Sequence, residues 1–298
     1  MDNNKKYIDM HIHSKYSDGY FDVKEIVDMA NQNEICFMAI SDHDSIKSLA
    51  ELQLEIPEGV YGTSAIEIST YMMLNQEKIK LHLLGYGFDS GNCELEKVLL
   101  ELKKRRMYFH KKFLEKLKSS FNNLPIEEID KLDIERYCWF DRDILACLKS
   151  CIKSSQELEN YLTFFKKNKM RYGIDYPIEI STAIAAINAA GGISVLAHPM
   201  AYNLSYEKVQ IIIKQLIDMG LQGIEVYQSD CSSYDSIRLL EEVNKYNLLY
   251  SVGSDFHRII NSDGREICKG INNNLCVSST SLTDYLIEKK LVFTKKKK

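Results

Sequence analysis

The chain has 298 residues and a formal net charge of −4, with 45% hydrophobic and 27% charged residues. This composition is that of a globular protein, and the length is enough to bury a sizeable core. The small negative charge provides no global basic field, so a long nucleic-acid duplex is not an expected partner. No apolar run approaches the roughly 18 residues that a membrane-spanning helix needs, so no membrane partner is expected either.

The N-terminus is polar and has no apolar stretch of signal-peptide length. The eight cysteines are scattered and include no Cys-x-x-Cys pair. Both features predict a cytoplasmic protein with reduced cysteines, and they leave the oligomeric state open.

Short apolar runs bounded by turn residues predict strands in the first third of the chain. These strands are 7–13, 36–41, 59–69 and 78–88, with a helix at 22–33 after the first. From residue 93 to about 177 the pattern is helical and almost free of strand signals. Helices and strands then alternate again, with helix 179–190, strand 192–199, helix 205–219, strand 223–227, helix 232–246 and strand 248–257.

Strands that alternate with helices predict parallel βαβ units. The simplest architecture is therefore an α/β barrel made of residues 1–92 and 178–298, interrupted by a helical insert at 93–177. In such barrels the reactive groups collect at the carboxyl ends of the strands.

Six of the seven histidines fall at or near the end of a predicted strand. They are His11, His13, His43, His82, His198 and His257. A single histidine at such a place is usually structural, but six that converge on one end of a barrel favour a metal site, because imidazole is a common ligand of Zn, Fe and Mn. The seventh, His110, lies within a long helix, where a structural or surface role is expected.

Carboxylates lie in the same places. Asp18 is in the turn after the first strand, Glu67 is near the end of a later one, and Asp255 precedes His257 by two residues. The His-x-His and Asp-x-His spacings direct two donors to the same side of an extended chain. Nine donors exceed what one metal ion uses, so we expect two or three ions with a carboxylate such as Glu67 between them. The Cys/His spacing of a structural zinc finger is absent, which favours a catalytic centre open to water.

Six short motifs occur in order along residues 7–92 and 178–257: "DMHIHSKYSDG", "AISDHDSI", "AIEIS", "LHLLGYGFD", "VLAHP" and "GSDFH". In this order they resemble the PHP family (polymerase and histidinol phosphatase). The resemblance is to its stand-alone phosphoesterase branch, which includes enzymes that act on nucleoside 3′,5′-bisphosphates and short oligonucleotides. It implies a distorted (β/α)7 TIM-like barrel that holds up to three metal ions.

The resemblance also implies a ligand set for each ion. The first ion would take His11, His13, Glu67 and Asp255, the second Glu67, His82 and His198, and the third Asp18, His43 and His257. The divalent ions would be Mn, Fe or Zn, since mixed nitrogen and oxygen sites accept all three. Asp9, Asp42 and Asp44 would orient imidazoles, because metal-bound histidines donate their second N–H to a carboxylate or carbonyl. For Asp42 and Asp44 the alternative is capping of a turn or helix.

The insert is expected to contribute to substrate recognition. Residues 103–118 carry eight Lys or Arg against one Glu, mostly as a solvated face. Arg106 lies on the apolar stripe of this helix, where a guanidinium needs an anionic partner, either a second substrate phosphate or an internal carboxylate. By the resemblance, Arg142 and Lys169 match positions that bind the non-reacting phosphate. Arg258 stands where relatives often have glycine after "SDFH", and it would reach a substrate phosphate or lie in solvent.

Together these features predict a metal-dependent phosphoric ester hydrolase. A metal-bridged hydroxide would be the nucleophile, and no serine or cysteine nucleophile is expected. The predicted reaction removes the 3′-phosphate from a nucleoside 3′,5′-bisphosphate, with 5′-3′ trimming of short oligonucleotides as a related activity. The alternatives are a histidinol-phosphate phosphatase, a cyclic phosphodiesterase, a non-catalytic PHP module, and an amidohydrolase-type enzyme, which commonly uses a bridging carboxylated lysine where this chain has Glu67.

Overall fold

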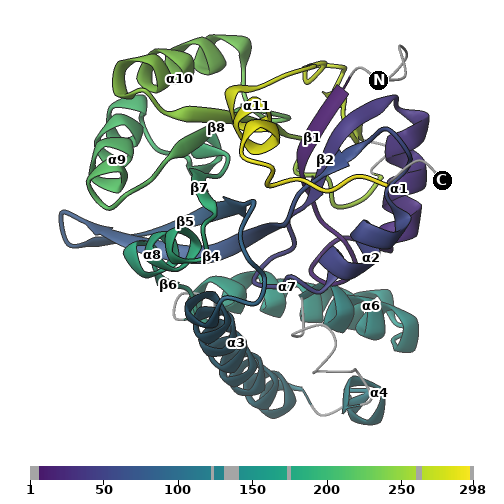
Figure 1. Cartoon of the computed structure of the whole chain (residues 1–298). Coiled ribbons are helices and arrows are strands. Elements are labelled where there is room, and N and C mark those ends of the chain that lie inside the picture. Colours follow the sequence, from purple (N-terminus) through teal and green to yellow (C-terminus); the bar gives the residue numbers. More distant parts are fainter. Residues whose placement is uncertain (1–6, 122–123, 131–140, 173–175, 260–263, 296–298) are drawn as a thin grey trace. The chain divides into compact units, whose positions relative to one another are not determined.

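The computed structural model describes residues 7–121, 124–130, 141–172, 176–259 and 264–295 (Figure 1). The chain divides into two compact units, which we call the sheet unit (residues 1–98 and 178–298) and the helical unit (residues 99–177). All nine predicted metal ligands belong to the sheet unit.

Most strands of the sheet unit belong to two sheets (Figure 1). The smaller sheet has three parallel strands in the order β1 (Tyr7–Ile12), β2 (Ile35–Ile40) and β3 (Tyr61–Gly62). The larger sheet has the order β6 (Ile178–Glu179), β4 (Ala65–Leu74), β5 (Glu77–Tyr86), β7 (Ile193–Leu196), β8 (Gly223–Gln228) and β9 (Leu249–Gly253). A short antiparallel pair follows, β10 (Arg265–Glu266) and β11 (Gly270–Ile271). The predicted strands are confirmed to within a few residues, except that 59–69 divides between β3 and β4.

The strand pair β4–β5 corrects the prediction of parallel units throughout. β5 runs antiparallel to β4 and also to β7. Only Asn75 and Gln76 separate β4 from β5, and both have a positive φ (50° and 68°), as a two-residue hairpin turn requires. So short a connection cannot join parallel strands, which need a crossover of a dozen or more residues.

Helices link most of the remaining strands of the sheet unit. They are α1 (Val23–Gln32), α2 (Ser48–Glu55), α8 (Ile180–Ala189), the 3₁₀ turn η1 (Pro199–Tyr202), α9 (Tyr206–Asp218), α10 (Ser233–Tyr246) and α11 (Ser281–Glu288). The helices predicted at 22–33, 179–190, 205–219 and 232–246 are confirmed, and α2 and α11 are additional. Asp22 caps the N-terminus of α1. Its side chain accepts the Glu25 N–H, and the Glu25 side chain accepts the Asp22 N–H in return.

Two isolated bridges connect the smaller sheet to the larger one. Ile12 pairs with Phe256, just after β9, and His43 pairs with Glu67 of β4. The predicted α/β class is therefore confirmed. The ladders of the described residues form separate sheets, so closure into a (β/α)7 barrel stays a prediction.

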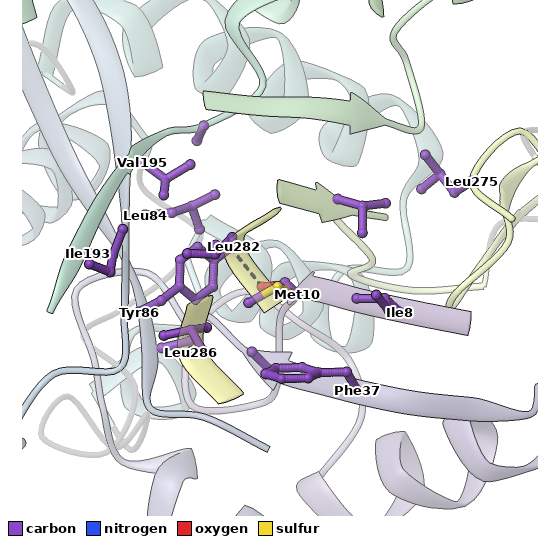
Figure 2. Close-up of a cluster of buried hydrophobic side chains, with 14 residues drawn as sticks. Ile8, Met10, Phe37, Leu84, Tyr86, Ile193, Val195, Leu275, Leu282 and Leu286 are labelled. Carbon is purple, nitrogen blue, oxygen red and sulfur yellow. Dashed lines mark hydrogen bonds between the residues drawn. The ribbon is translucent and has the colours of Figure 1, made fainter. Parts of the chain in front are cut away.

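A buried apolar cluster joins the two sheets (Figure 2). Most of its side chains come from β1, β2, β4, β5, β7, β9 and α11. Within it the Tyr86 hydroxyl of β5 donates a hydrogen bond to the Met10 carbonyl oxygen of β1 (2.9 Å), and both residues are fully buried. A second cluster packs β1 and β2 against α1 and α2. Segments that carry predicted ligands are therefore supported by shared apolar cores.

The helical unit is described by α3 (Cys93–Ser120), which begins in the sheet unit, α4 (Ile126–Asp130), α6 (Asp141–Cys151) and α7 (Ser155–Tyr172). An apolar cluster built on Phe113, Leu117, Ile144, Leu148 and Tyr161 holds these helices together. The described part of this unit contains helices and no strand. In the described ranges of the whole chain, no helix is both long and apolar enough to cross a membrane.

Tyr86→Phe tests the contact between the two sheets. The variant removes the hydroxyl bonded to the buried Met10 carbonyl, so we expect the free energy of unfolding to fall by about 1–2 kcal/mol. Urea unfolding followed by circular dichroism measures this change. Tyr234→Phe, on a ring that is 68% exposed, is the control and should change stability by less than about 0.5 kcal/mol. A Tyr86→Phe protein as stable as the parent would contradict this role for the hydroxyl.

Candidate metal centre

The nine predicted ligands come from six segments of the sheet unit. His11 is in β1, with His13 and Asp18 after it; His43 follows β2; Glu67 is in β4 and His82 in β5; His198 follows β7; and Asp255 and His257 follow β9. Each of the nine has a ring nitrogen or carboxylate oxygen within 3.2 Å of another member of the set. The structure therefore brings all nine together in one cluster.

His82 differs from its predicted position at a strand end. It lies in the middle of β5, opposite Ser69 of β4. Because β5 is antiparallel to β4, the middle of β5 lies beside the part of β4 that carries Glu67, two residues before Ser69. The His82 ring therefore joins the cluster without ending its strand.

The Glu67 carboxylate lies at the centre of the cluster and is fully buried. Its Oε2 atom faces His11 Nε2 (3.1 Å), His13 Nε2 (3.1 Å) and His43 Nδ1 (3.2 Å). Its Oε1 atom faces His82 Nδ1 (2.8 Å) and His198 Nε2 (2.8 Å). One carboxylate thus lies between five imidazoles, with its two oxygens directed to two different groups of rings.

Asp255 and Asp18 provide oxygens on either side of the His13 ring. Asp255 Oδ1 lies 3.2 Å from His13 Nε2 and 3.5 Å from His11 Nε2. Asp18 Oδ1 lies 3.5 Å from His13 Nδ1 and 3.2 Å from His257 Nε2. His13 therefore has a carboxylate near each of its ring nitrogens.

Three groups in the cluster have ligand atoms that all lie within 4.8 Å of one another. They are His11, His13, Glu67 and Asp255; His43, Glu67 and His82; and His13, Asp18, His43 and His257. Histidine and carboxylate donors in this geometry are typical of Mn, Fe and Zn sites.

Four buried atoms at the centre make no hydrogen bond: Nε2 of His11, Nε2 of His13, Nδ1 of His43 and Oε2 of Glu67. Leaving a buried polar atom without a hydrogen bond costs free energy, so such an atom usually has another partner, such as a bound ion or water molecule. These four converge, and divalent cations bound between them would satisfy them all. The residues present therefore fit a metal centre.

The cluster also shifts the pKa values of its members. Burial raises the pKa of Glu67, but the imidazoles of His43 and His11 outweigh burial and hold that pKa well below its usual range. Burial lowers the pKa of His13, whereas the neighbouring carboxylates of Asp255 and Glu67 raise it to about 10. Opposite charges thus stabilise one another here, and a metal ion that binds these imidazoles displaces their protons.

Two of the carboxylates predicted to orient imidazoles bind backbone groups instead. Asp9 accepts the N–H groups of Ser254 (2.9 Å) and Cys268 (2.8 Å), and Asp44 accepts the N–H of Ser69 (2.7 Å). Asp9 thereby connects β1 to the segment after β9, and Asp44 connects the segment after β2 to β4. These contacts position the segments that carry the ligands.

Asp42 reaches an imidazole through a serine. It accepts hydrogen bonds from the Ser14 N–H (2.8 Å), the Ser14 hydroxyl (2.7 Å) and the Ser17 hydroxyl (2.5 Å). The Ser17 hydroxyl in turn lies 3.4 Å from His13 Nδ1. The two serines are therefore held in the turn after β1 by one buried carboxylate.

Sequence reasoning missed Glu225, a fully buried residue of β8. Its Oε1 atom lies 2.9 Å from His11 Nδ1, so it contacts a ligand ring on the side away from Glu67. A signal was present, because Glu225 stands between Ile224 and Val226 in an apolar run, and a carboxylate is rarely buried without a partner.

Arg106 is buried in the helical unit, as its place on the apolar stripe predicts. Its guanidinium carbon lies 4.6 Å from the centre of the Tyr176 ring. His110, one turn further along α3, is also buried, which excludes a surface role. Burial and the Arg106 charge lower the pKa of His110 to about 3, so this ring is neutral at pH 7.

The other residues predicted to bind phosphate lie at the surface or outside the described part. Arg258 is exposed and donates a hydrogen bond to the Tyr20 hydroxyl (3.3 Å). Arg142 belongs to α6 and Lys169 to α7, but their side chains lie outside the described residues. A phosphate-binding role for these residues stays a prediction.

The chain is similar to several known proteins along most of its length, although no family model matches it. It is 30% identical over 264 residues to a 5′-3′ exoribonuclease of Haemophilus influenzae, covering 85% of this chain and 90% of that protein. It is 28% identical to a phosphoribosyl 1,2-cyclic phosphate 1,2-diphosphodiesterase of Eggerthella lenta, covering 84% and 93%. It is 26% identical to a 3′,5′-nucleoside bisphosphate phosphatase of Chromobacterium violaceum, covering 84% and 87%.

Two solved structures share the fold. The structure of an amidohydrolase from Chromobacterium violaceum with bound sulfate matches with a TM-score of 0.71 at 21% identity, covering 97% of this chain and 98% of that one. A protein from Bifidobacterium adolescentis matches with a TM-score of 0.67 at 22% identity, covering 94% and 95%. The arrangement of sheets and helices is therefore one that experiments have observed.

The fold, the histidine and carboxylate cluster and the relatives together define a phosphoric ester hydrolase. More narrowly, the chain belongs to the PHP family of metal-dependent phosphoesterases, which confirms the resemblance seen in the order of its motifs.

Glu67→Gln tests whether the cluster binds metal ions. A cation that binds only the folded protein raises the Tm, and the variant removes the charge that faces five imidazoles. We therefore expect Mn²⁺ to raise the Tm of the parent protein and to raise that of the variant by less than half as much, measured by differential scanning fluorimetry. Glu288→Gln, whose side chain is 73% exposed, should keep the full rise. An undiminished rise in Glu67→Gln would show that Glu67 is not a ligand.

Proposed function

We propose that this protein removes the 3′-phosphate from nucleoside 3′,5′-bisphosphates and that it uses two or three divalent ions, Mn, Fe or Zn. The observation that carries the proposal is the buried carboxylate of Glu67 between five imidazoles, a donor set suited to these metals. The choice of a bisphosphate is supported by the Chromobacterium violaceum relative, which is named for that activity.

The exposure of the ligands indicates the side from which substrate approaches. Glu67 and His11 are fully buried, whereas the side chains of Asp18, His82 and His257 are 31%, 32% and 28% exposed. A phosphate group would therefore meet the partly exposed members first. Divalent cations bound in the cluster would supply an activated water and neutralise the phosphoryl oxygens. The chain itself supplies a fixed set of donors, with Glu67 holding the inner rings in place.

Trimming of short oligonucleotides in the 5′-3′ direction is a second candidate activity. The Haemophilus influenzae relative is named for it. The surface of α3 also favours it, because the Tyr108 ring is 66% exposed and Lys104, Lys111 and Lys112 are exposed near it along the helix. Exposed aromatic rings flanked by basic side chains are typical of surfaces that bind single-stranded nucleic acid.

The proposal includes a role for the insert and a cytoplasmic location. Arg106, Arg142 and Lys169 of the insert would bind the phosphate that does not react, as the family resemblance implies, and Arg258 is a further candidate. Each cysteine in the described part of the chain is free, which suits a reducing compartment.

Phosphate release from adenosine 3′,5′-bisphosphate in the presence of Mn²⁺ tests the main proposal. We expect turnover by the parent protein and a loss of more than about 100-fold in His11→Ala, since loss of a ligand should exceed the effect of losing an outer contact. Tyr234→Phe should keep full activity. A metal-replete protein that hydrolyses no phosphoester in a broad panel would contradict the proposal.

The same panel separates the alternatives. Faster hydrolysis of a phosphoribosyl 1,2-cyclic phosphate would favour the cyclic phosphodiesterase, an activity for which the Eggerthella lenta relative is named. Faster hydrolysis of histidinol phosphate would favour that phosphatase. Activity on amide substrates alone would favour an amidohydrolase, and metal binding without any turnover would favour a non-catalytic module.

Arg142→Ala and Lys169→Ala test the insert. If these residues bind the non-reacting phosphate, each variant should raise the KM for the bisphosphate by about 10-fold or more, because a charge-assisted hydrogen bond is lost. The KM for a nucleoside monophosphate should change little. Lys149→Ala in α6 and Lys167→Ala in α7 change exposed lysines of the same helices and serve as controls. Equal effects on both substrates would argue against this role.

A further inference from the structure

Glu225 is an ionisable residue in the middle of a buried strand of the larger sheet. It is fully buried, and a buried carboxylate is tolerated only where partners satisfy its oxygens. Both of its oxygens are engaged, and each is engaged by a different predicted metal ligand.

The first oxygen faces the ring of His11. Glu225 Oε1 lies 2.9 Å from His11 Nδ1, close enough to accept a hydrogen bond from the Nδ1–H group. With the proton held on Nδ1, the other ring nitrogen has a free lone pair. That nitrogen, Nε2, is the one that faces Glu67 Oε2 (3.1 Å) and Asp255 Oδ1 (3.5 Å). A carboxylate at this position favours the tautomer with the proton on Nδ1, which leaves Nε2 available to a cation.

The second oxygen holds the backbone that carries His198. Glu225 Oε2 accepts the His198 N–H at 2.7 Å. His198 has a φ of 26°, a positive value that residues other than glycine rarely adopt. The hydrogen bond helps to hold this backbone, and the ring then reaches Glu67 Oε1 (2.8 Å).

The backbone of β9 packs directly against Glu225 and His11. Gly253 of β9 lies beside the pair, and a Cβ atom at that position would fall 2.1 Å from His11 Cβ and 2.5 Å from Glu225 Oε1. Neither side chain can move aside easily, because both are fully buried. The contact between Glu225 and His11 is therefore enforced by the sheet as well as by the hydrogen bond.

From these contacts we infer that Glu225 is a positioning residue for the metal centre: one carboxylate selects the ligating nitrogen of His11 and sets the place of His198. The inference rests on the proposed metal centre and deepens it. Because Glu225 is fully buried, it would act through these two ligands and not on the substrate directly. It couples a ligand from β1 to a ligand after β7, so its loss disturbs two ligands that both reach Glu67.

Glu225→Gln is the informative variant because it keeps the shape of the side chain and replaces one hydrogen-bond acceptor with a donor. An amide accepts through its oxygen only. If that oxygen faces the His198 N–H, the amide N–H₂ group faces His11 Nδ1 and moves the ring proton to Nε2, where it blocks metal binding. If the oxygen faces His11, two N–H donors oppose each other at His198. One ligand is displaced in either case.

The matched control is Glu242→Gln. Glu242 is another buried carboxylate of the sheet unit (4% exposed), but it accepts a hydrogen bond from Gln210 of α9 (2.6 Å) and lies outside the ligand set. We expect Glu225→Gln to bind Mn²⁺ about 10–100-fold more weakly than the parent, measured by competition with a chelating dye. Glu242→Gln should bind as the parent does. Circular dichroism should show all three proteins folded.

A second readout follows the ring proton directly. In Zn²⁺-loaded protein labelled with ¹⁵N-histidine, the His11 Nδ1–H signal, assigned by its absence from His11→Gln, should be present in the parent and in Glu242→Gln. It should be shifted or lost in Glu225→Gln, whereas a purely structural role would leave it unchanged.

The outcomes separate this inference from the proposed function. Unchanged Mn²⁺ affinity and an unchanged Nδ1–H signal in Glu225→Gln would overturn the inference, and so would equal losses of affinity in Glu225→Gln and Glu242→Gln. A parent that binds Mn²⁺ but hydrolyses no phosphoester would overturn the proposed function and leave the inference standing. A parent that binds no divalent cation would overturn both.

Discussion

The buried contact of Glu67 with five imidazoles is the interaction around which the sheet unit is organised. A carboxylate removed from water is stable only if positive or hydrogen-bonding groups surround it, and here rings from four strands and their ends do so. Each ring is therefore one of the groups that make this buried carboxylate tolerable. The fold must therefore bring β1, β2, β5 and β7 to one place, which explains why the apolar core spans both sheets.

Several of the segments that converge there leave ideal strand geometry. Asp44, His198 and Asp255 all have positive φ values (50°, 26° and 55°) just after strands β2, β7 and β9. Such conformations are costly for residues other than glycine and persist where surrounding contacts hold them. Each of these residues donates its backbone N–H to a neighbouring segment; the acceptors are the Glu67 carbonyl, the Glu225 carboxylate and the His11 carbonyl. The hydrogen bonds that hold the backbone and the charges that hold the rings therefore involve the same residues.

Local spacing was sufficient to predict most strands and helices and to single out nine side chains that the structure brings into one cluster, because side-chain direction in a strand depends on neighbours one or two residues away. The errors have a different origin. The position of His82 follows from a two-residue turn that reverses β5, and the partners of Asp9 lie about 245 and 259 residues away in sequence. Glu225 was missed for the same reason, since its partner His11 belongs to a strand at the other end of the chain. Contacts between distant segments leave only a weak local signal.

The centre alone cannot select a substrate. Its donors are nitrogens and oxygens that would act on a phosphoryl group through bound cations, and this chemistry is indifferent to what the phosphate is attached to. The relatives fit this view, because proteins similar to this chain along most of its length are named for three different reactions on phosphate esters. Selection must therefore come from groups that contact the rest of the substrate. Glu225 is fully buried and engaged by His11 and His198, so the differences between substrates must be recognised by other side chains outside the ligand set.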